Sequence, residues 1–262
     1  MSAPLIHPGA VIEKGAQIGT NVRIGPFCHI GPEVILHDGV HLHSHVVVSG
    51  QTEIGAKTEV HPFAVLGGIP QDLKFDGETT RLIIGERNRI REHVTMNTGT
   101  AGGGGVTCVG DDGLFMASCH VAHDAHVGNQ VILANNVALA GHCLLEDQVI
   151  VGGLSGVHQF VRIGRGAIIG AVTMVTHDVI PHGLVQGPRG TLDGLNLVGL
   201  KRRGVAREDI SALRAAFQAL AQGEGAFQDR ARRLADENDS DMVREITNFV
   251  LGTSDRSFLT PG

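Results

Sequence analysis

The sequence predicts an all-β solenoid of three-sided coils followed by a small α-helical domain. A large aliphatic residue returns at every sixth position from Ile6 to Leu66. Four positions after each comes a small, β-branched or thiol residue, from Ala10 to Ala64. A period of six fits neither a helix nor a strand with one buried face. It fits a chain that turns a corner every six residues, and three such sides make a coil of about 18 residues.

Two interruptions of the repeat predict loops that leave the solenoid, at about residues 67–82 and 98–107. Between them the repeat returns at three positions, Ile84, Ile90 and Met96. After the second interruption it resumes one residue out of phase and holds for twelve positions, from Val109 to Val175. Long loops on a rigid scaffold usually carry function. We therefore expect a solenoid domain over residues 1–190 with two functional loops.

The remaining residues, 191–262, lose the hexad spacing and are rich in Leu, Ala, Arg and Glu. Residues 192–203 are expected to form a short helix that ends at Gly204. Apolar residues at helical spacing predict a second helix over residues 208–221. Two more are expected over residues 227–238 and 241–251. Together they predict a small C-terminal helical domain.

Composition narrows the class of protein. The formal net charge of −6 and the pI of about 6.2 argue against nucleic acid as the main partner. No apolar run approaches the ~18 residues needed to span a membrane, and no signal peptide opens the chain, so the cytoplasm is the expected location. The four cysteines have no C-x-x-C spacing, which predicts neither a disulfide nor a zinc knot. The 37 glycines and the absence of Trp and Tyr suit tight corners around an interior too narrow for large rings.

Histidines from several coils are expected to gather along one edge of the solenoid. Residues one coil apart lie about 4.8 Å from each other, as neighbouring strands do. His123 and His142 are 19 positions apart, and His142 and His158 are 16 apart. His120 and His126 lie in the same coil as His123.

Three interpretations of these histidines are open from the residues alone. They are solvated corner residues, or a zinc site across a trimer interface as in solenoid carbonic anhydrases, or a general base with neighbours that bind an anionic or sugar substrate. Asp124 follows His123 directly, but adjacent residues in a strand point in opposite directions. A His123–Asp124 pair therefore requires the strand to turn there.

Several strings resemble the UDP-N-acetylglucosamine O-acyltransferase family, which begins lipid A synthesis. They are Gln71-Asp72-Leu73-Lys74, His120-Val121-Ala122-His123-Asp124, Leu139-Ala140-Gly141-His142, Val157-His158-Gln159-Phe160 and Gly199-Leu200-Lys201-Arg202-Arg203-Gly204. The likeness covers nearly the whole chain. It implies a left-handed parallel β-helix, a homotrimer with active sites between subunits, and no cofactor or metal. It also implies two substrates, UDP-N-acetylglucosamine and a (3R)-3-hydroxyacyl chain on acyl carrier protein.

The resemblance also assigns roles to single residues. It implies that His123 removes the proton of the sugar 3-hydroxyl, that Asp124 supports His123, and that the backbone N–H of Gly141 stabilises the oxyanion. An imidazole with a pKa near 6.5 is suited to activate a hydroxyl, which is a poor nucleophile at neutral pH. Contacts to the sugar, phosphate or acyl chain are implied for Gln71, Asp72, Lys74, His120, His142, His158 and Gln159. Contacts to the uridine and phosphate end are implied for Asn196, Arg202 and Arg203.

Three positions bear on specificity. Asn97 stands where the family usually has histidine, and it either shifts acceptor choice, for example toward a 3-amino sugar, or has no effect. Val198 stands where the family has a glutamate near the nucleotide, and it cannot accept a hydrogen bond. Ala171 matches a position that limits acyl-chain length, and its methyl group indicates a slightly shorter tunnel than glycine would leave.

Other classes of function rank below the O-acyltransferase. A zinc-dependent solenoid lyase or hydratase of the carbonic-anhydrase type would contain stoichiometric zinc. A sister N-acyltransferase is less favoured because the hexads already begin at Ile6. A purely structural solenoid ranks last, because it has no use for Asp72 and Lys74 in the first loop.

Overall fold

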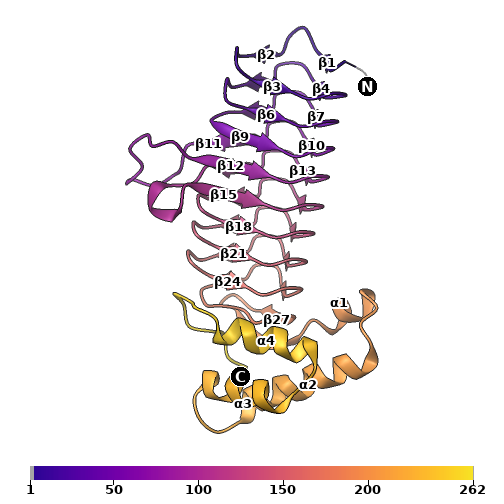
Figure 1. Cartoon of the computed structure of the whole chain (residues 1–262), viewed down its shortest axis with the longest axis vertical. Coiled ribbons are helices and arrows are strands. Elements are labelled where there is room, and N and C mark those ends of the chain that lie inside the picture. Colours follow the sequence, from indigo (N-terminus) through magenta and orange to yellow (C-terminus); the bar gives the residue numbers. More distant parts are fainter. Residues whose placement is uncertain (1–2, 262) are drawn as a thin grey trace.

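The computed structural model describes residues 3–261, which form a tall column of stacked coils with helices at one end (Figure 1). Each coil has three short strands, one in each of three sheets. Sheet A contains β1 (Leu5–Ile6), β4 (Arg23–Ile24), β7 (His41–Leu42), β10 (Glu59–Val60), β13 (Arg89–Ile90), β16 (Leu114–Phe115), β19 (Ile132–Leu133), β22 (Ile150–Val151), β25 (Ile168–Ile169), β27 (Gly183–Gln186) and β28 (Thr191–Leu195).

The other two sheets follow the same order along the column. Sheet B contains β2 (Val11–Ile12), β5 (His29–Ile30), β8 (Val47–Val48), β11 (Val65–Gly68), β14 (Thr95–Asn97), β17 (His120–Val121), β20 (Ala138–Leu139), β23 (Gly156–Val157) and β26 (Met174–Val175). Sheet C contains β3 (Gln17–Ile18), β6 (Ile35–Leu36), β9 (Gln51–Ile54), β12 (Arg81–Ile84), β15 (Val106–Val109), β18 (His126–Val127), β21 (Leu144–Leu145) and β24 (Arg162–Ile163).

The strand register confirms the predicted coil. Outside the coils that carry the loops and the last coil, strands pair in parallel with the strand one coil away, and the paired residues are 18 positions apart, as in Leu5 with Arg23. In most two-residue strands the second residue is the hexad position and is buried, whereas the first faces outward. Sequence spacing therefore translates directly into position on a face of the column.

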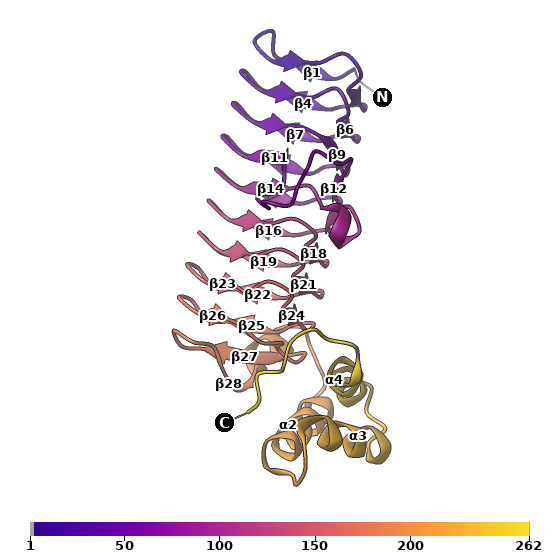
Figure 2. The same ribbon diagram turned by 90° about the vertical axis from the view of Figure 1, so that its left-hand side faces the viewer.

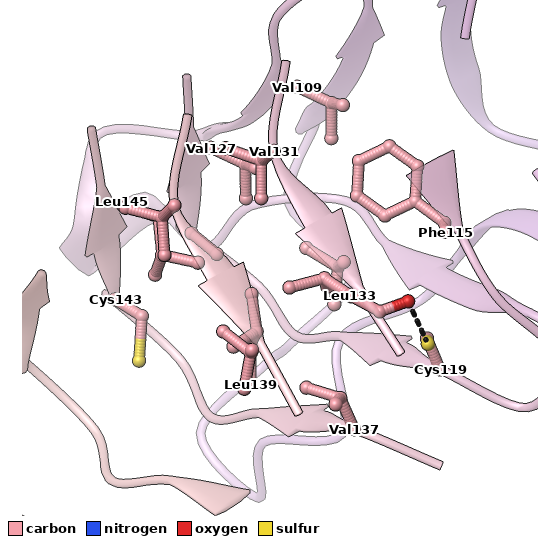
Figure 3. Close-up of a cluster of buried hydrophobic side chains, with 14 of the residues drawn as sticks. Val109, Phe115, Cys119, Val127, Val131, Leu133, Val137, Leu139, Cys143 and Leu145 are labelled. Carbon is pink, nitrogen blue, oxygen red and sulfur yellow. Dashed lines mark hydrogen bonds between the residues drawn. The ribbon is translucent and has the colours of Figure 1, made fainter. Parts of the chain in front are cut away.

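The hexad residues fill the column with a continuous apolar core. Leu133, Leu139 and Leu145 come from the three successive sides of one coil and point into the same interior (Figure 3). Phe115 is completely buried in this core, so the expectation that the interior excludes large rings is wrong. Burial raises the pKa of the Cys119 thiol to about 11, and the thiol donates to the Leu133 carbonyl at 3.4 Å.

The corners do not depend on glycine as expected. Within residues 3–261, positive φ occurs at 18 non-glycine residues and 11 glycines. Glycine is instead required where coils approach each other closely. A Cβ on Gly55 would lie 2.4 Å from the carbonyl carbon of Gly85 in the next coil.

Both predicted loops leave the column at the same corner, between sheets B and C, and project together from one side (Figure 1). Gln51 and Arg81 pair although they are 30 positions apart, so the first loop adds 12 residues to its coil. Arg81 and Val106 are 25 apart, so the second loop adds seven. The second loop contains a 3-10 turn, η1 (Ala101–Gly103).

The C-terminal segment begins differently from the prediction. Residues 192–195 belong to β28, which pairs antiparallel with β27, so the helix expected from Leu192 is wrong there. Leu192 and Leu195 are buried in the core that ends the column, and this packing overrides local preference. The division into domains at residue 190 stays a prediction.

Helices follow at this end of the column, where α2, α3 and α4 are labelled in Figure 2. They are α1 (Leu197–Arg202), α2 (Arg207–Gln222), α3 (Phe227–Glu237) and α4 (Asp241–Leu251). The last three match the predicted helices closely. None of the helices in the described chain has both the length and the apolar character that a bilayer span requires.

Candidate active site

A groove of about 780 Å³ runs along the outer face of sheet B. Strands β17, β20, β23 and β26 supply its floor from four consecutive coils, and residues 71–74 of the first loop also line it. The predicted site residues that line the groove are Gln71, Asp72, Lys74, His120, His123, Gly141, His158 and Gln159. The loop and the histidine edge therefore form one site.

The floor is shaped by small residues at outward positions. His120, Ala138, Gly156 and Met174 follow one another in register along sheet B. A Cβ on Gly156 would lie 3.1 Å from the terminal methyl of Met174. The groove thus keeps its depth because two successive coils carry only a methyl group or a hydrogen there.

His123 and Asp124 form a buried pair beside this floor. The chain turns after β17, and Asp124 adopts a left-handed backbone with φ of 58°. This turn brings the Asp124 carboxylate to 2.8 Å from Nδ1 of His123. The side chains are only 9% and 0% exposed. The structure thus supplies the turn that the predicted pair required.

The second loop holds the Asp124 carboxylate in place. The backbone N–H and the hydroxyl of Thr100 donate to its two oxygens at 2.8 and 2.6 Å. A Cβ on Gly103 would lie 2.1 Å from the carboxyl carbon, and one on Gly99 would lie 2.8 Å from Oδ1. The glycine run therefore lets the loop pack directly on this carboxylate. The sequence identified the loop, but it gave no signal for Thr100.

These contacts favour an ionised Asp124 and set the tautomer of the neutral His123 ring. Burial alone would raise the pKa of the Asp124 carboxyl, but hydrogen bonds from Thr100 and His123 outweigh it, so the pKa lies below its ordinary value. An ionised carboxylate only accepts hydrogen bonds, so Nδ1 of His123 carries a hydrogen. The neutral imidazole consequently has its free lone pair on Nε2.

Gly141 and His142 stand one coil further along. A Cβ on Gly141 would lie 2.7 Å from Nε2 of His123, so only glycine leaves this imidazole in place. The His142 backbone N–H donates to the His123 carbonyl at 3.0 Å, and the two rings meet edge to face with centroids 5.1 Å apart. Burial lowers the pKa of His142, although Asp124 opposes this effect. The predicted stacking of these histidines is confirmed.

His158 in the following coil has a partner that the sequence analysis missed. Nη2 of Arg256 lies 2.8 Å from Nδ1 of His158, and Nε of Arg256 donates to the Gln159 carbonyl at 3.0 Å. A guanidinium has only donors, so Nδ1 accepts and Nε2 of His158 carries the hydrogen. Arg256 lies 98 positions away in the segment after α4, where residue spacing gave no indication of the contact.

His120 also sits in a defined setting. Its Nδ1 is 2.8 Å from the Thr95 hydroxyl of the preceding coil. Burial, and then the nearby His123, lower its pKa. Asp72 accepts from the Lys74 backbone N–H at 3.0 Å, which shapes the tip of the first loop. His126, in contrast, is exposed on sheet C and does not join the groove.

Seven predicted site residues are not among those that line the groove of their own chain. Asp124 and His142 stand beside it, next to His123, whereas the other five are Asn97, Ala171, Asn196, Arg202 and Arg203. Asn97 donates to the Ile69 carbonyl at 2.9 Å and so ties the base of the first loop, while its Oδ1 is buried without a partner. Asn196 caps α1 by accepting from the Gly199 N–H. Arg203 lies against His182 at the end of the column.

Both the N-terminal and the C-terminal parts of the chain are similar to known proteins. A family model described as Udp N-acetylglucosamine O-acyltransferase, Domain 2, matches residues 178–259. Another, described as Bacterial transferase hexapeptide (six repeats), matches residues 2–32. A Paracoccus denitrificans protein named acyl-[acyl-carrier-protein]–UDP-N-acetylglucosamine O-acyltransferase is 72% identical over 202 residues, which is 77% of each chain. Its namesake from Agrobacterium fabrum is 51% identical over 205 residues, 77% of this chain and 75% of its own.

Solved structures agree over almost the full length. A UDP-N-acetylglucosamine acyltransferase crystal structure has a TM-score of 0.95 at 42% identity and covers 98% of this chain and 99% of its own. The Campylobacter jejuni acyltransferase has a TM-score of 0.92 at 36% identity, with 98% and 100% covered. Fold and site thus define a hexapeptide-repeat acyltransferase with a left-handed parallel β-helix. The chain belongs to the acyl-[acyl-carrier-protein]–UDP-N-acetylglucosamine O-acyltransferase family.

Proposed function

We propose that this chain transfers a (3R)-3-hydroxyacyl group from acyl carrier protein to the 3-hydroxyl of UDP-N-acetylglucosamine, the first step of lipid A biosynthesis. The names of its relatives support the donor and the acceptor. The observation that carries the chemistry is the His123–Asp124 pair. His123 lines the groove, and its Nε2 is free to accept a proton. The cytoplasm stays the expected location.

In this reaction His123 acts as general base. Nε2 takes the proton of the sugar hydroxyl as the oxygen forms a bond to the thioester carbonyl carbon. The Asp124 carboxylate stabilises the imidazolium that results. When the carbon–sulfur bond breaks, the imidazolium returns the proton to the departing thiolate. The products are the acylated sugar nucleotide and the free thiol of the carrier.

The Gly141 backbone N–H is suited to stabilise the oxyanion. Gly141 forms a corner of the column next to His123, and no acceptor within residues 3–261 takes its N–H. Backbone N–H groups at other corners bind anions, as Thr20 does when it donates to the Asp38 carboxylate at 2.7 Å. A fixed donor beside the developing charge lowers the barrier without reorganisation.

The remaining predicted residues bind the substrates in this proposal. Contacts to the sugar, phosphate or acyl chain come from His142 beside His123 and from the groove-lining residues Gln71, Asp72, Lys74, His120, His158 and Gln159. Asn196, Arg202 and Arg203 contact the uridine and phosphate end, and Arg suits a diphosphate because its fork donates two hydrogen bonds. We propose a homotrimer in which these three residues of one subunit contribute to the groove of a neighbouring subunit, because they do not line the groove of their own chain. Ala171 then limits the acyl chain and Asn97 acts through the first loop.

The test compares His123→Ala with His126→Ala, which removes an exposed imidazole three residues away and outside the groove. Acyl transfer from a hydroxyacyl carrier protein to UDP-N-acetylglucosamine is measured for both. We expect the His123 variant to fall by about 10² to 10⁴ in kcat/KM and to keep its fold and oligomeric state. The His126 variant should match the unmodified protein. Normal turnover by the His123 variant would remove this residue from the mechanism.

A further inference from the structure

A second group of potential metal ligands lies on sheet A, away from the groove on sheet B. His41 faces outward from β7, His43 follows it at the next corner, and Glu59 faces outward from β10 in the following coil. One ligand atom from each of the three lies within 4.8 Å of the others. We call these residues the His41 cluster. They play no part in the proposed acyl transfer.

The distances within the His41 cluster suit a single ion. Oε1 of Glu59 is 2.7 Å from Nε2 of His43 and 3.9 Å from Nδ1 of His41. Tetrahedral zinc holds its nitrogen and oxygen ligands at about 2.0–2.2 Å, which puts the ligand atoms about 3.3 Å from one another. The observed distances bracket that value. Small rotations of these half-buried side chains would therefore complete a two-histidine, one-carboxylate site with water as the fourth ligand.

Further titratable side chains lie around the three ligands. Nε2 of His61 is 3.7 Å from Oε1 of Glu59, and its Nδ1 is 3.5 Å from Oε1 of Glu92. Glu92 is held in turn by Arg91. The rings of His41 and His43 stack at 4.2 Å, and those of His43 and His61 at 4.6 Å. Such outer partners orient metal ligands and are often as necessary as the ligands themselves.

Other histidine–glutamate contacts on the column lack a third ligand. His37 lies 2.7 Å from Glu53 and His29 lies 2.9 Å from Glu13. Neither pair belongs to a group of three potential ligands in the described part of the chain. The contrast matters because an isolated histidine–glutamate contact is explained by an ordinary hydrogen bond, whereas three potential ligands within 4.8 Å of one another can hold one ion.

We propose that His41, His43 and Glu59 bind one zinc-type divalent ion that links two consecutive coils of the N-terminal half. Imidazole-rich sites with one carboxylate select zinc, copper or nickel over magnesium and calcium. The bound ion joins β7 to β10 and so opposes separation of these coils. It raises thermal stability and leaves acyl transfer unchanged, because none of the three residues touches the groove.

The test titrates Zn²⁺ into full-length protein freed of metal with a chelator. Bound zinc is counted by elemental analysis, and affinity is obtained against a competing chelator. His43→Ala and Glu59→Gln should lose one equivalent of zinc or at least about 10-fold in affinity, and His61→Ala should weaken binding about 10- to 100-fold. His37→Ala is the matched control and should bind as the unmodified protein does.

Two further measurements keep the test decisive. Circular dichroism of the metal-free variants checks that they remain folded, and zinc should raise the melting temperature of the unmodified protein and of His37→Ala more than that of the other variants. Cobalt substitution should give the visible absorption of a four-coordinate site. Equal zinc binding by all variants would overturn the proposal. A loss of zinc only in His142→Ala would also overturn it, because His142 belongs to the other group of potential ligands. So would the absence of zinc binding.

Discussion

Replacing Thr100 by Val tests whether the second loop supports the catalytic pair. The substitution keeps the shape of the side chain and the backbone N–H contact but removes the hydroxyl that donates to Asp124 at 2.6 Å. Asp124 is fully buried, so the lost donor leaves part of an ionised carboxylate unsatisfied. A hydrogen bond to a charged group contributes about 1.5–3 kcal/mol. We expect the free energy of unfolding to fall by that amount at neutral pH.

The pH dependence of this loss follows from the lowered pKa of Asp124. A carboxyl whose pKa is lower in the folded state stabilises the protein above its unfolded pKa of about 3.9. That contribution disappears as the pH falls through the folded value. The difference between Thr100→Val and the unmodified protein should therefore shrink in acid, once Asp124 is protonated in both.

Urea unfolding at several pH values and steady-state kinetics measure these effects. Acyl transfer should decrease because Asp124 orients His123, and Thr100→Ser should restore both activity and stability. Thr98→Val is the matched control, since Thr98 accepts a buried hydrogen bond from Thr80 at 3.0 Å and does not contact the pair. Equal stability and turnover of Thr100→Val and the unmodified protein would refute the claim that Thr100 supports the His123–Asp124 pair.

Three other substitutions test separate parts of the structure. Gly141→Ala places a methyl group 2.7 Å from Nε2 of His123, so we expect kcat to fall at least tenfold while the melting temperature changes little, and equal kcat would contradict the packing. Arg256→Ala frees the His158 ring and should raise KM for the sugar nucleotide, and Arg256→Lys should restore a low KM. An unchanged KM in steady-state kinetics would show that the Arg256–His158 contact does not contribute to substrate binding. Leu139→Ala opens a cavity in the core and should cost about 2–5 kcal/mol in urea unfolding, whereas a cost below 1 kcal/mol would mean that the coil collapses around it.

The fold was predictable because its core repeats with a fixed period. Each hexad position from Ile24 onward adds one buried apolar side chain, so the periodicity records the corners directly. The stacking of His123 over His142 follows from the same period. The loops were found as interruptions in it. Once a period is known, the position of a residue on the column is a matter of counting.

The parts that were missed depend on contacts outside this period. Thr100 reaches Asp124 from an irregular loop, and Arg256 reaches His158 from a segment after the last helix. Leu192 lies in a strand because β28 pairs with β27 at the end of the column, and not because the local sequence favours a strand. Such contacts are set by the tertiary structure, and no local pattern records them.

The coil also defines the unit in which this chain tolerates change. Excising residues 20–37, one whole turn of 18 positions, would shorten the column yet leave every later side chain on its original face. Excising six residues at the same place would rotate everything downstream by one face relative to the first coil. Length variants of this enzyme should therefore add or remove whole coils. The change should lie N-terminal to the first loop, so that the distance between His123 and His142 stays the same.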